Sequence, residues 1–282
     1  FDESNVPIFS MDIYGKDVYP FPYPFRYPKA GEENSEITLY RFTLDTRKKD
    51  RIHFEGEYPY YVPRMSYLDG ANGLIIQTLN RHQNDLKVWR WNSQQNKLQL
   101  LLEEKEETYV SIHDNLKFLA NGSFLWTSEK DGFNHIYHYD TNGSLIRQIT
   151  KGNWEVTALF DYSPKNKEIY YQSVEGSSIE RGLYAIKLSG KGKRKLQPTQ
   201  GTNGATFSVG GSYYIHSYSD EKTPPIYTLY ETRKNTPLYT ILKNDTLTKT
   251  LQPFGFSDKE FSTLEINGAS LNMWMIKPAD FD

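Results

Sequence analysis

Short runs in which hydrophobic and polar residues alternate recur along the chain, and each carries an aromatic residue at an equivalent position. The five runs are Ile37–Tyr40, Leu86–Trp89, Asn134–Tyr137, Gly182–Tyr184 and Pro225–Tyr227. Their aromatic residues follow one another at intervals of 49, 48, 47 and 43 residues. Alternation with a period of two predicts β-strands that bury one face. The steady interval predicts that one structural unit is repeated along the chain.

A second predicted strand precedes four of these five runs. These strands are Gly73–Leu79, Gly122–Thr127, Glu168–Gln172 and Ser212–His216. A repeat of about 40–50 residues with several strands in each unit is typical of a β-propeller, whereas helical repeats would show a period of 3.6. We therefore predict an all-β fold, a partial β-propeller of four-stranded blades. Residues 1–260 provide about four to five blades, so the ring is expected to be incomplete.

The stretch Ser128–Glu155 illustrates one such unit. Alternation around Ile136–Asp140 predicts a half-buried strand. Asn142 and Gly143 then predict a two-residue type I′ turn, in which both central residues have positive φ. The pattern therefore predicts a strand, a turn, a second strand, a tight turn and a third strand.

Residues 1–35 combine closely spaced prolines with many aromatic residues, and residues 13–36 are the candidate for a projecting arm. Proline at this density excludes a central strand, so we predict an irregular segment. Two interpretations stay open: a loop packed on its own domain, or a projecting arm that buries its aromatic residues against a partner subunit. The aromatic residues concerned are Tyr14, Tyr19, Phe21, Tyr23, Phe25 and Tyr27.

The last residues leave the repeat pattern. Phe261–Ile266 and Leu271–Pro278 are predicted strands that flank the turn dipeptide Asn267-Gly268. We expect residues 261–282 to be the first strands of another domain that lies beyond this chain.

Composition narrows the possible partners. Lys and Arg number 33 against 35 Asp and Glu, and this near-balance gives no electrostatic basis for binding nucleic acid. The chain has no cysteine, which excludes disulfides, thiolate nucleophiles and Cys-type zinc sites, and which fits either a cytoplasm or a bacterial periplasm. No apolar run approaches the ~20 residues of a membrane span. Because the chain begins without Met or a signal peptide, we expect a mature or excised piece.

Motifs that would carry chemistry do not occur in the sequence. There is no Gly-x-Ser-x-Gly nucleophile elbow, no phosphate-binding glycine loop and no His-Glu-x-x-His. His135 and His138 are three residues apart in a predicted strand, so their side chains point to opposite faces. We therefore expect no catalytic residue, no metal and no cofactor. His113 and Asp114 are either a hydrogen-bonded turn pair or part of a ligand-contacting loop.

The order of several motifs gives the chain a family resemblance. Ser128–Tyr137 with Thr150–Val156, Phe1–Pro7 with Tyr27–Asn34, and the terminal Leu271–Asp282 resemble successive segments of the dipeptidyl peptidase IV family of prolyl oligopeptidase-type serine peptidases. The resemblance covers nearly the whole chain and is closest to bacterial, Bacteroides-like members. It implies an N-terminal β-propeller region followed by an α/β-hydrolase domain.

The resemblance also implies a function. The whole enzyme would be an aminopeptidase that releases N-terminal Xaa-Pro or Xaa-Ala dipeptides, and its Ser–Asp–His triad would lie beyond Asp282. This chain would gate and position the substrate and contribute to a homodimer, in a periplasmic, secreted or cell-envelope protein. An alternative from the residues alone is a stand-alone propeller that binds peptide or glycan.

Site residues follow from the same resemblance. The family's glutamate pair, which holds the substrate's amine, is expected upstream of Phe1, so Glu32-Glu33 and Glu103–Glu107 are not assigned that role. The family's extended substrate pocket maps near Tyr109, Val110 and Ser111, although the family's arginine is missing there, and the possible ligand-contacting loop adds His113 as a further substrate-binding candidate. Tyr14 to Glu36 matches the family's dimer arm.

Overall fold

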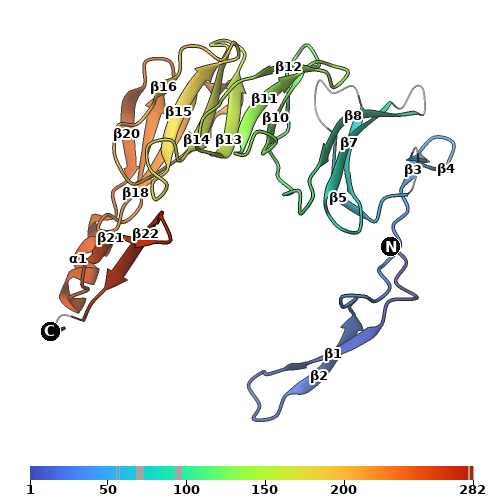
Figure 1. Cartoon of the computed structure of the whole chain (residues 1–282), viewed down its shortest axis with the longest axis horizontal. Coiled ribbons are helices and arrows are strands. Elements are labelled where there is room, and N and C mark those ends of the chain that lie inside the picture. The colour runs from blue at the N-terminus through green and yellow to red at the C-terminus, as the bar shows by residue number, and fades with distance from the viewer. Residues whose placement is uncertain (55, 57, 68–72, 93–96, 279, 282) are drawn as a thin grey trace. The chain divides into compact units, whose positions relative to one another are not determined.

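A computed structural model describes residues 1–54, 56, 58–67, 73–92, 97–278 and 280–281. These residues form almost entirely antiparallel β-structure, with one short α-helix, α1 (Asp245–Leu251), which the sequence pattern did not predict. The chain divides into two compact units, Phe1–Ile112 and His113–Asp282. Each unit is described separately below (Figure 1).

The first unit contains one four-stranded blade and two hairpins. The hairpins are β1 (Ile8–Ile13) with β2 (Phe21–Arg26), and β3 (Tyr40–Thr43) with β4 (Lys48–Arg51). The blade runs in the order β5 (Tyr61–Tyr67), β6 (Leu74–Leu79), β7 (Asp85–Asn92) and β8 (Lys97–Lys105). Ile52, next to β4, belongs to the hydrophobic cluster of this blade with Ile76, Trp89 and Trp91.

The second unit contains three four-stranded blades and a terminal hairpin. The first blade consists of β9 (Lys117–Phe118), β10 (Phe124–Ser128), β11 (His135–Tyr139) and β12 (Leu145–Gln148), and the second of β13 (Val156–Ser163), β14 (Glu168–Ser173), β15 (Gly182–Lys187) and β16 (Arg194–Lys195). The third consists of β17 (Thr202–Phe207), β18 (Tyr213–Ser219), β19 (Ile226–Glu231) and β20 (Thr236–Leu242). The hairpin pairs β21 (Lys259–Ile266) with β22 (Ala269–Ile276). The predicted partial propeller of four-stranded blades is confirmed.

Successive blades of the second unit pack face to face, and this buries strands from both sides. One cluster joins Leu125 and Ile136 of the β9–β12 blade to Ile169 and Tyr171 of the next blade. All five residues of β11 are buried. The expectation of a half-buried strand at this position was therefore wrong, because the face opposite the next blade is covered as well, with Trp154 against His135 and Lys130 over the Tyr137 ring.

The turn between β11 and β12 also differs from the prediction. Gly143 has φ of 91°, but Asn142 is not among the residues with positive φ. The Asp140 N–H donates to the carbonyl of Ser144, and Tyr139 pairs with Leu145, so the connection is a longer loop and not a two-residue type I′ turn. At Asn267 and Gly268 both φ angles are positive, at 51° and 80°, as a type I′ turn requires.

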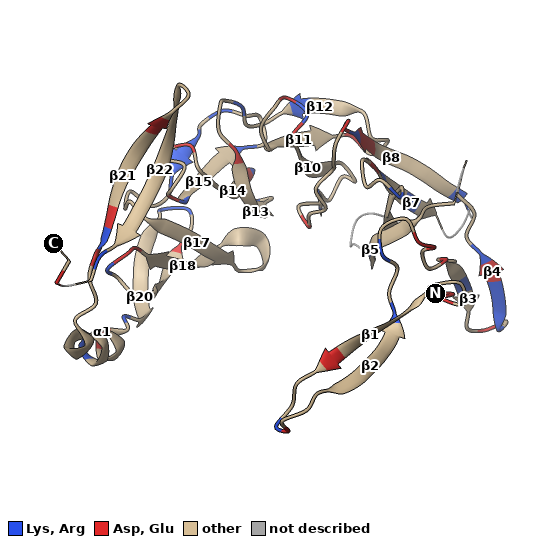
Figure 2. Cartoon of the chain, turned by 60° about the horizontal axis from the view of Figure 1, so that its bottom comes forward, with Lys and Arg blue, Asp and Glu red and all other residues tan. Residues whose placement is uncertain are grey.

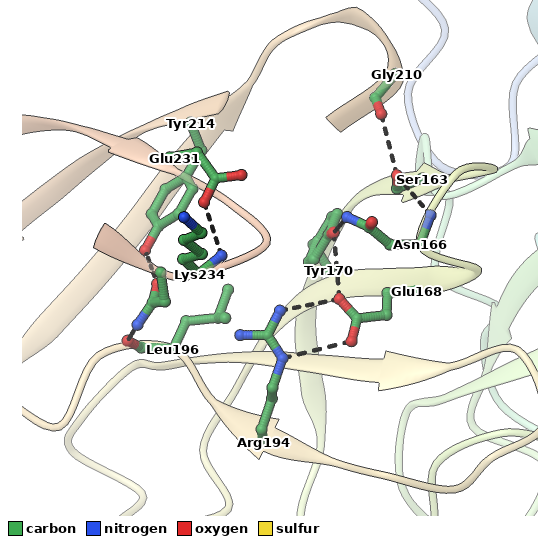
Figure 3. A network of polar contacts seen from close by, with 11 residues as sticks. Ser163, Asn166, Glu168, Tyr170, Arg194, Leu196, Gly210, Tyr214, Glu231 and Lys234 are labelled. Carbon is green, nitrogen blue, oxygen red and sulfur yellow. Dashed lines mark hydrogen bonds and ion pairs between the residues drawn. The ribbon is translucent and has the colours of Figure 1, made fainter. Parts of the chain in front are cut away.

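Polar contacts join the second and third of these blades (Figure 3). The Tyr214 hydroxyl donates to Asn235 Oδ1 at 2.5 Å, and the Asn235 amide donates to the carbonyl of Leu196. The Ser163 hydroxyl donates to the carbonyl of Gly210 at 3.1 Å. Each of these groups would be costly to bury without a partner, so the network fixes how the two blades dock.

Hydrogen bonds join the two parts of the family-resembling stretch, Ser128–Tyr137 and Thr150–Val156. Its central residue is His135, which is fully buried. The Nδ1 of His135 lies 3.0 Å from the Thr150 hydroxyl, and its Nε2 lies 3.0 Å from the carbonyl of Gly152. The Asn134 amide donates to the carbonyl of Val156 at 2.6 Å. These contacts tie the start of β11 to the loop that leads into the next blade.

Candidate functional site

The segment 109–113, predicted to line a substrate pocket, falls at the boundary between the two units, so its parts are described separately. In the first unit, the Tyr109 side chain is 51% exposed, whereas Val110 is buried. The Val110 N–H donates to the carbonyl of Gln83 in the β6–β7 turn at 2.9 Å, which fixes the backbone beside Tyr109. Ser111 is exposed. Tyr109 and Ser111 are therefore the accessible side chains in this part of the predicted pocket.

In the second unit, His113 is held by protein groups on both ring nitrogens. Its Nδ1 accepts the Asn115 N–H at 3.2 Å, so Nε2 carries the proton and donates to the carbonyl of Thr127 at 2.8 Å. The ring lies 4.1 Å from that of Trp126. Burial lowers the pKa of His113, which keeps the imidazole neutral. This geometry suits an anchor of the loop better than a ligand-binding side chain.

The hairpin β1–β2 provides the second candidate site. Its register pairs Phe9 with Phe25, Met11 with Tyr23, and Ile13 with Phe21. Side chains opposite each other in an antiparallel pair share a face, so these residues and the following Tyr27 form one surface. We call this surface the aromatic face, and it consists of Phe9, Met11, Ile13, Phe21, Tyr23, Phe25 and Tyr27.

The aromatic face is exposed although its rings pack on one another. Ring centroids lie 5.8 Å apart for Phe9 and Phe25 and for Tyr23 and Phe25. Phe21, Tyr23 and Tyr27 nevertheless remain 52–56% exposed. Figure 2 shows few charged segments along β1 and β2, whereas β4 is largely basic. A contiguous exposed patch of this kind marks an interaction surface.

The sequence anticipated this surface in part. Phe21, Tyr23, Phe25 and Tyr27 of the predicted arm lie on the aromatic face, whereas Tyr14 and Tyr19 lie in the connecting loop and are 74% and 84% exposed. Phe9, Met11 and Ile13 were missed, and their period-two spacing opposite the aromatic strand was the available signal. The expectation of an irregular segment was wrong, because proline is tolerated in an edge strand.

The base of the hairpin is fixed by one arginine. Arg26 Nη1 donates to the carbonyl of Ser4 at 3.1 Å and to that of Val6 at 2.5 Å. Val6 itself is buried. The hairpin is therefore anchored at Arg26 and the preceding segment.

Two further kinds of site to consider among the described residues are a metal centre and a membrane-spanning helix. No group of three His, Asp or Glu side chains there could hold a metal ion. Nor is any of its helices long and apolar enough to cross a bilayer.

Comparison with known proteins agrees with this architecture. Residues 1–225 match the family described as the dipeptidyl peptidase IV N-terminal region. The crystal structure of Porphyromonas gingivalis dipeptidyl peptidase 4 superimposes with a TM-score of 0.88 and 37% identity, covering 99% of this chain and 40% of that one. A putative dipeptidyl aminopeptidase IV from Bacteroides ovatus gives a TM-score of 0.80 at 25% identity, covering 100% of this chain and 43% of that one.

Curated relatives show the same partial coverage. Dipeptidyl peptidase 4 of Arthroderma otae is 27% identical over 304 residues, which include 100% of this chain but 38% of the relative. A probable dipeptidyl-aminopeptidase B of Phaeosphaeria nodorum is 24% identical, over 99% of this chain and 34% of the relative. The chain therefore spans well under half the length of these relatives. It belongs to the dipeptidyl peptidase IV N-terminal region family, as a partial β-propeller.

Proposed function

We propose that this chain is the substrate-positioning and dimerising part of a serine exopeptidase that releases N-terminal Xaa-Pro or Xaa-Ala dipeptides. The observation that carries the proposal is the family match over residues 1–225 combined with a blade architecture that contains no nucleophile motif. A propeller beside a hydrolase domain contributes by orienting the substrate, since remote contacts help to position the reacting bond. The chemistry then belongs to the hydrolase domain.

The 282-residue chain alone should not cleave a Gly-Pro chromogenic substrate, whereas an enzyme that joins it to a hydrolase domain should. The assay compares the release of chromophore by both proteins at equal concentration, with and without a serine-directed inhibitor. Turnover by the isolated chain that the inhibitor blocks would contradict the proposal.

Tyr109 is the side chain through which we propose that the chain contacts the substrate. It is exposed on a backbone fixed by the hydrogen bond of Val110, so an aromatic contact there requires little ordering. In the whole enzyme, Tyr109→Ala should raise KM several-fold for substrates longer than a tripeptide and leave Gly-Pro chromogenic turnover unchanged. Tyr40→Ala, which also removes an exposed tyrosine, provides the matched control.

We also propose that the aromatic face packs against a partner subunit. An exposed surface of seven apolar residues is costly to leave in water, and aromatic residues are enriched at interfaces. Deleting residues 14–27 should convert a dimer of the whole enzyme into a monomer, as measured by light scattering. An unchanged mass would rule out this role. A periplasmic or cell-envelope location is part of the same proposal, and cell fractionation tests it.

A further inference from the structure

The two edges of the hairpin β1–β2 differ in their capacity to pair with another strand. The Tyr27 N–H donates to the carbonyl of Pro7 at 3.1 Å, which identifies the odd-numbered residues of β2 as those bonded to β1. The N–H positions of residues 22, 24 and 26 therefore point outward. Two of these positions are proline, so the outer edge of β2 lacks donors there.

The outer edge of β1 carries no such block. Ile8, Ser10 and Asp12 are the residues opposite Arg26, Pro24 and Pro22, so their N–H and C=O groups point away from β2. The sheet has two strands, and no described strand pairs with β1 on this side. Proline protects one edge of the hairpin and leaves the other open, as expected where one edge has a partner.

From this asymmetry we propose that β1 pairs antiparallel with β1 of a second copy of this chain across a two-fold axis at Ser10. The inference rests on the proposed dimer role of the hairpin and specifies its geometry. An isolated two-stranded hairpin is only marginally stable in water, whereas a sheet of three or more strands with a hydrophobic face can be stable by itself. Pairing through β1 creates a four-stranded sheet in the order β2, β1, β1 of the copy, β2 of the copy.

The residues of β1 are self-complementary in this register. The two-fold axis places Ser10 opposite Ser10 and Ile8 opposite Asp12 of the other copy, so the two Asp12 carboxylates do not face each other. Arg26 lies opposite Ile8 on the neighbouring strand, and Ile8 lies opposite Asp12 of the other copy. Arg26 and that Asp12 are therefore two strands apart on the same face, a separation of about 10 Å. The aromatic faces of both copies then lie on the same side of the sheet, because Ser10 projects from the opposite side.

Cysteine crosslinking tests the register, and the chain is suited to it because it has no cysteine. Residues directly opposite in a hydrogen-bonded antiparallel pair have Cα atoms about 5.5 Å apart, within the range of a disulfide. Ser10→Cys should give a disulfide-linked dimer under mild oxidation, with at least a five-fold higher yield than Asp17→Cys in the connecting loop. Equal yields, or a higher yield for Asp17→Cys, would overturn the pairing.

A proline substitution tests the edge itself. Ser10→Pro removes the outward N–H of β1 but none of the bonds to β2, as Pro24 opposite it already shows. Light scattering should report the 32.9 kDa monomer for Ser10→Pro and a dimer for the control Ser10→Thr. A dimer that survives Ser10→Pro but is lost in a Tyr23→Ser, Phe25→Ser variant would overturn the edge pairing and leave the dimer role of the aromatic face intact. A wild-type chain and whole enzyme that both remain monomeric would overturn both proposals.

Discussion

Two buried tyrosines of the second unit differ in one respect, and this difference predicts opposite effects of the same mutation. Tyr171 and Tyr214 are 0% and 1% exposed, and each packs at an interface between blades. The Tyr214 hydroxyl accepts from the Gln197 amide at 2.7 Å and donates to Asn235. The Tyr171 hydroxyl is buried without a hydrogen-bond partner among the described residues.

Replacing each tyrosine with phenylalanine removes the hydroxyl and keeps the ring. Tyr214→Phe loses two hydrogen bonds, leaves the Gln197 amide buried without this partner and removes the donor to the half-buried Asn235 Oδ1, so it should destabilise the protein by roughly 2–3 kcal/mol. Tyr171→Phe removes a hydroxyl that is already desolvated without compensation, so its effect should lie between zero and about 1 kcal/mol of stabilisation.

The measurement is urea denaturation of the 282-residue chain, followed by tryptophan fluorescence, with both variants and the wild type in the same buffer. Tyr214→Phe should lower the midpoint clearly, while Tyr171→Phe should equal or exceed the wild-type midpoint at an unchanged slope. A loss of stability by Tyr171→Phe as large as that of Tyr214→Phe would refute the reasoning.

Three further predictions concern the second unit. Burial lowers the pKa of His216 from 6.5 to about 4, so as the pH falls the unfolded chain binds this proton before the folded chain does. The free energy of unfolding should therefore fall by about 3 kcal/mol between pH 6.5 and pH 4. Denaturation at several pH values should show a smaller loss for His216→Gln. Thr150→Val should cost roughly 1–3 kcal/mol in urea denaturation, because the Thr150 hydroxyl contacts His135 and the Ile136 N–H, whereas exposed Thr246→Val should cost little. Leu125→Ala, at 0% exposure, should lower the urea midpoint by the equivalent of about 2–5 kcal/mol, and a change within error would contradict the packing between blades.

The pH prediction depends on the tautomer at His216. The Asn203 amide donates to the carbonyls of Arg181 and Thr199, so its Oδ1 must accept, and His216 Nε2–H is the donor at 2.9 Å. The neutral imidazole can make this hydrogen bond in its buried site. A second proton would place a positive charge where water cannot solvate it. Stability is therefore complete above the ordinary histidine pKa and decreases as the pH falls.

The sequence by itself determined the repeated blade. The recurring aromatic at Trp89, Tyr137, Tyr184 and Tyr227 identified the third strand of each four-stranded blade, Tyr40 identified β3 of the two-stranded hairpin, and Asn267-Gly268 identified the terminal turn. These features are local, because a period of two and a turn with positive φ depend on neighbouring residues alone. The family resemblance rests on equally local motifs, whose hydrogen bonds join the start of β11 to the segment that leads into the next blade.

The tertiary structure decided which faces are covered. Alternation around Tyr137 predicted one solvent-exposed face, but both are buried, because the next blade packs on Ile136 and the side chains of Trp154 and Lys130 cover His135 and Tyr137. In the hairpin the reverse holds: the pairing of Met11 with Tyr23 placed apolar residues from two strands on one face that no described element covers. Burial depends on residues distant in sequence, so the alternation of one strand indicates which residues share a face but not what lies against it.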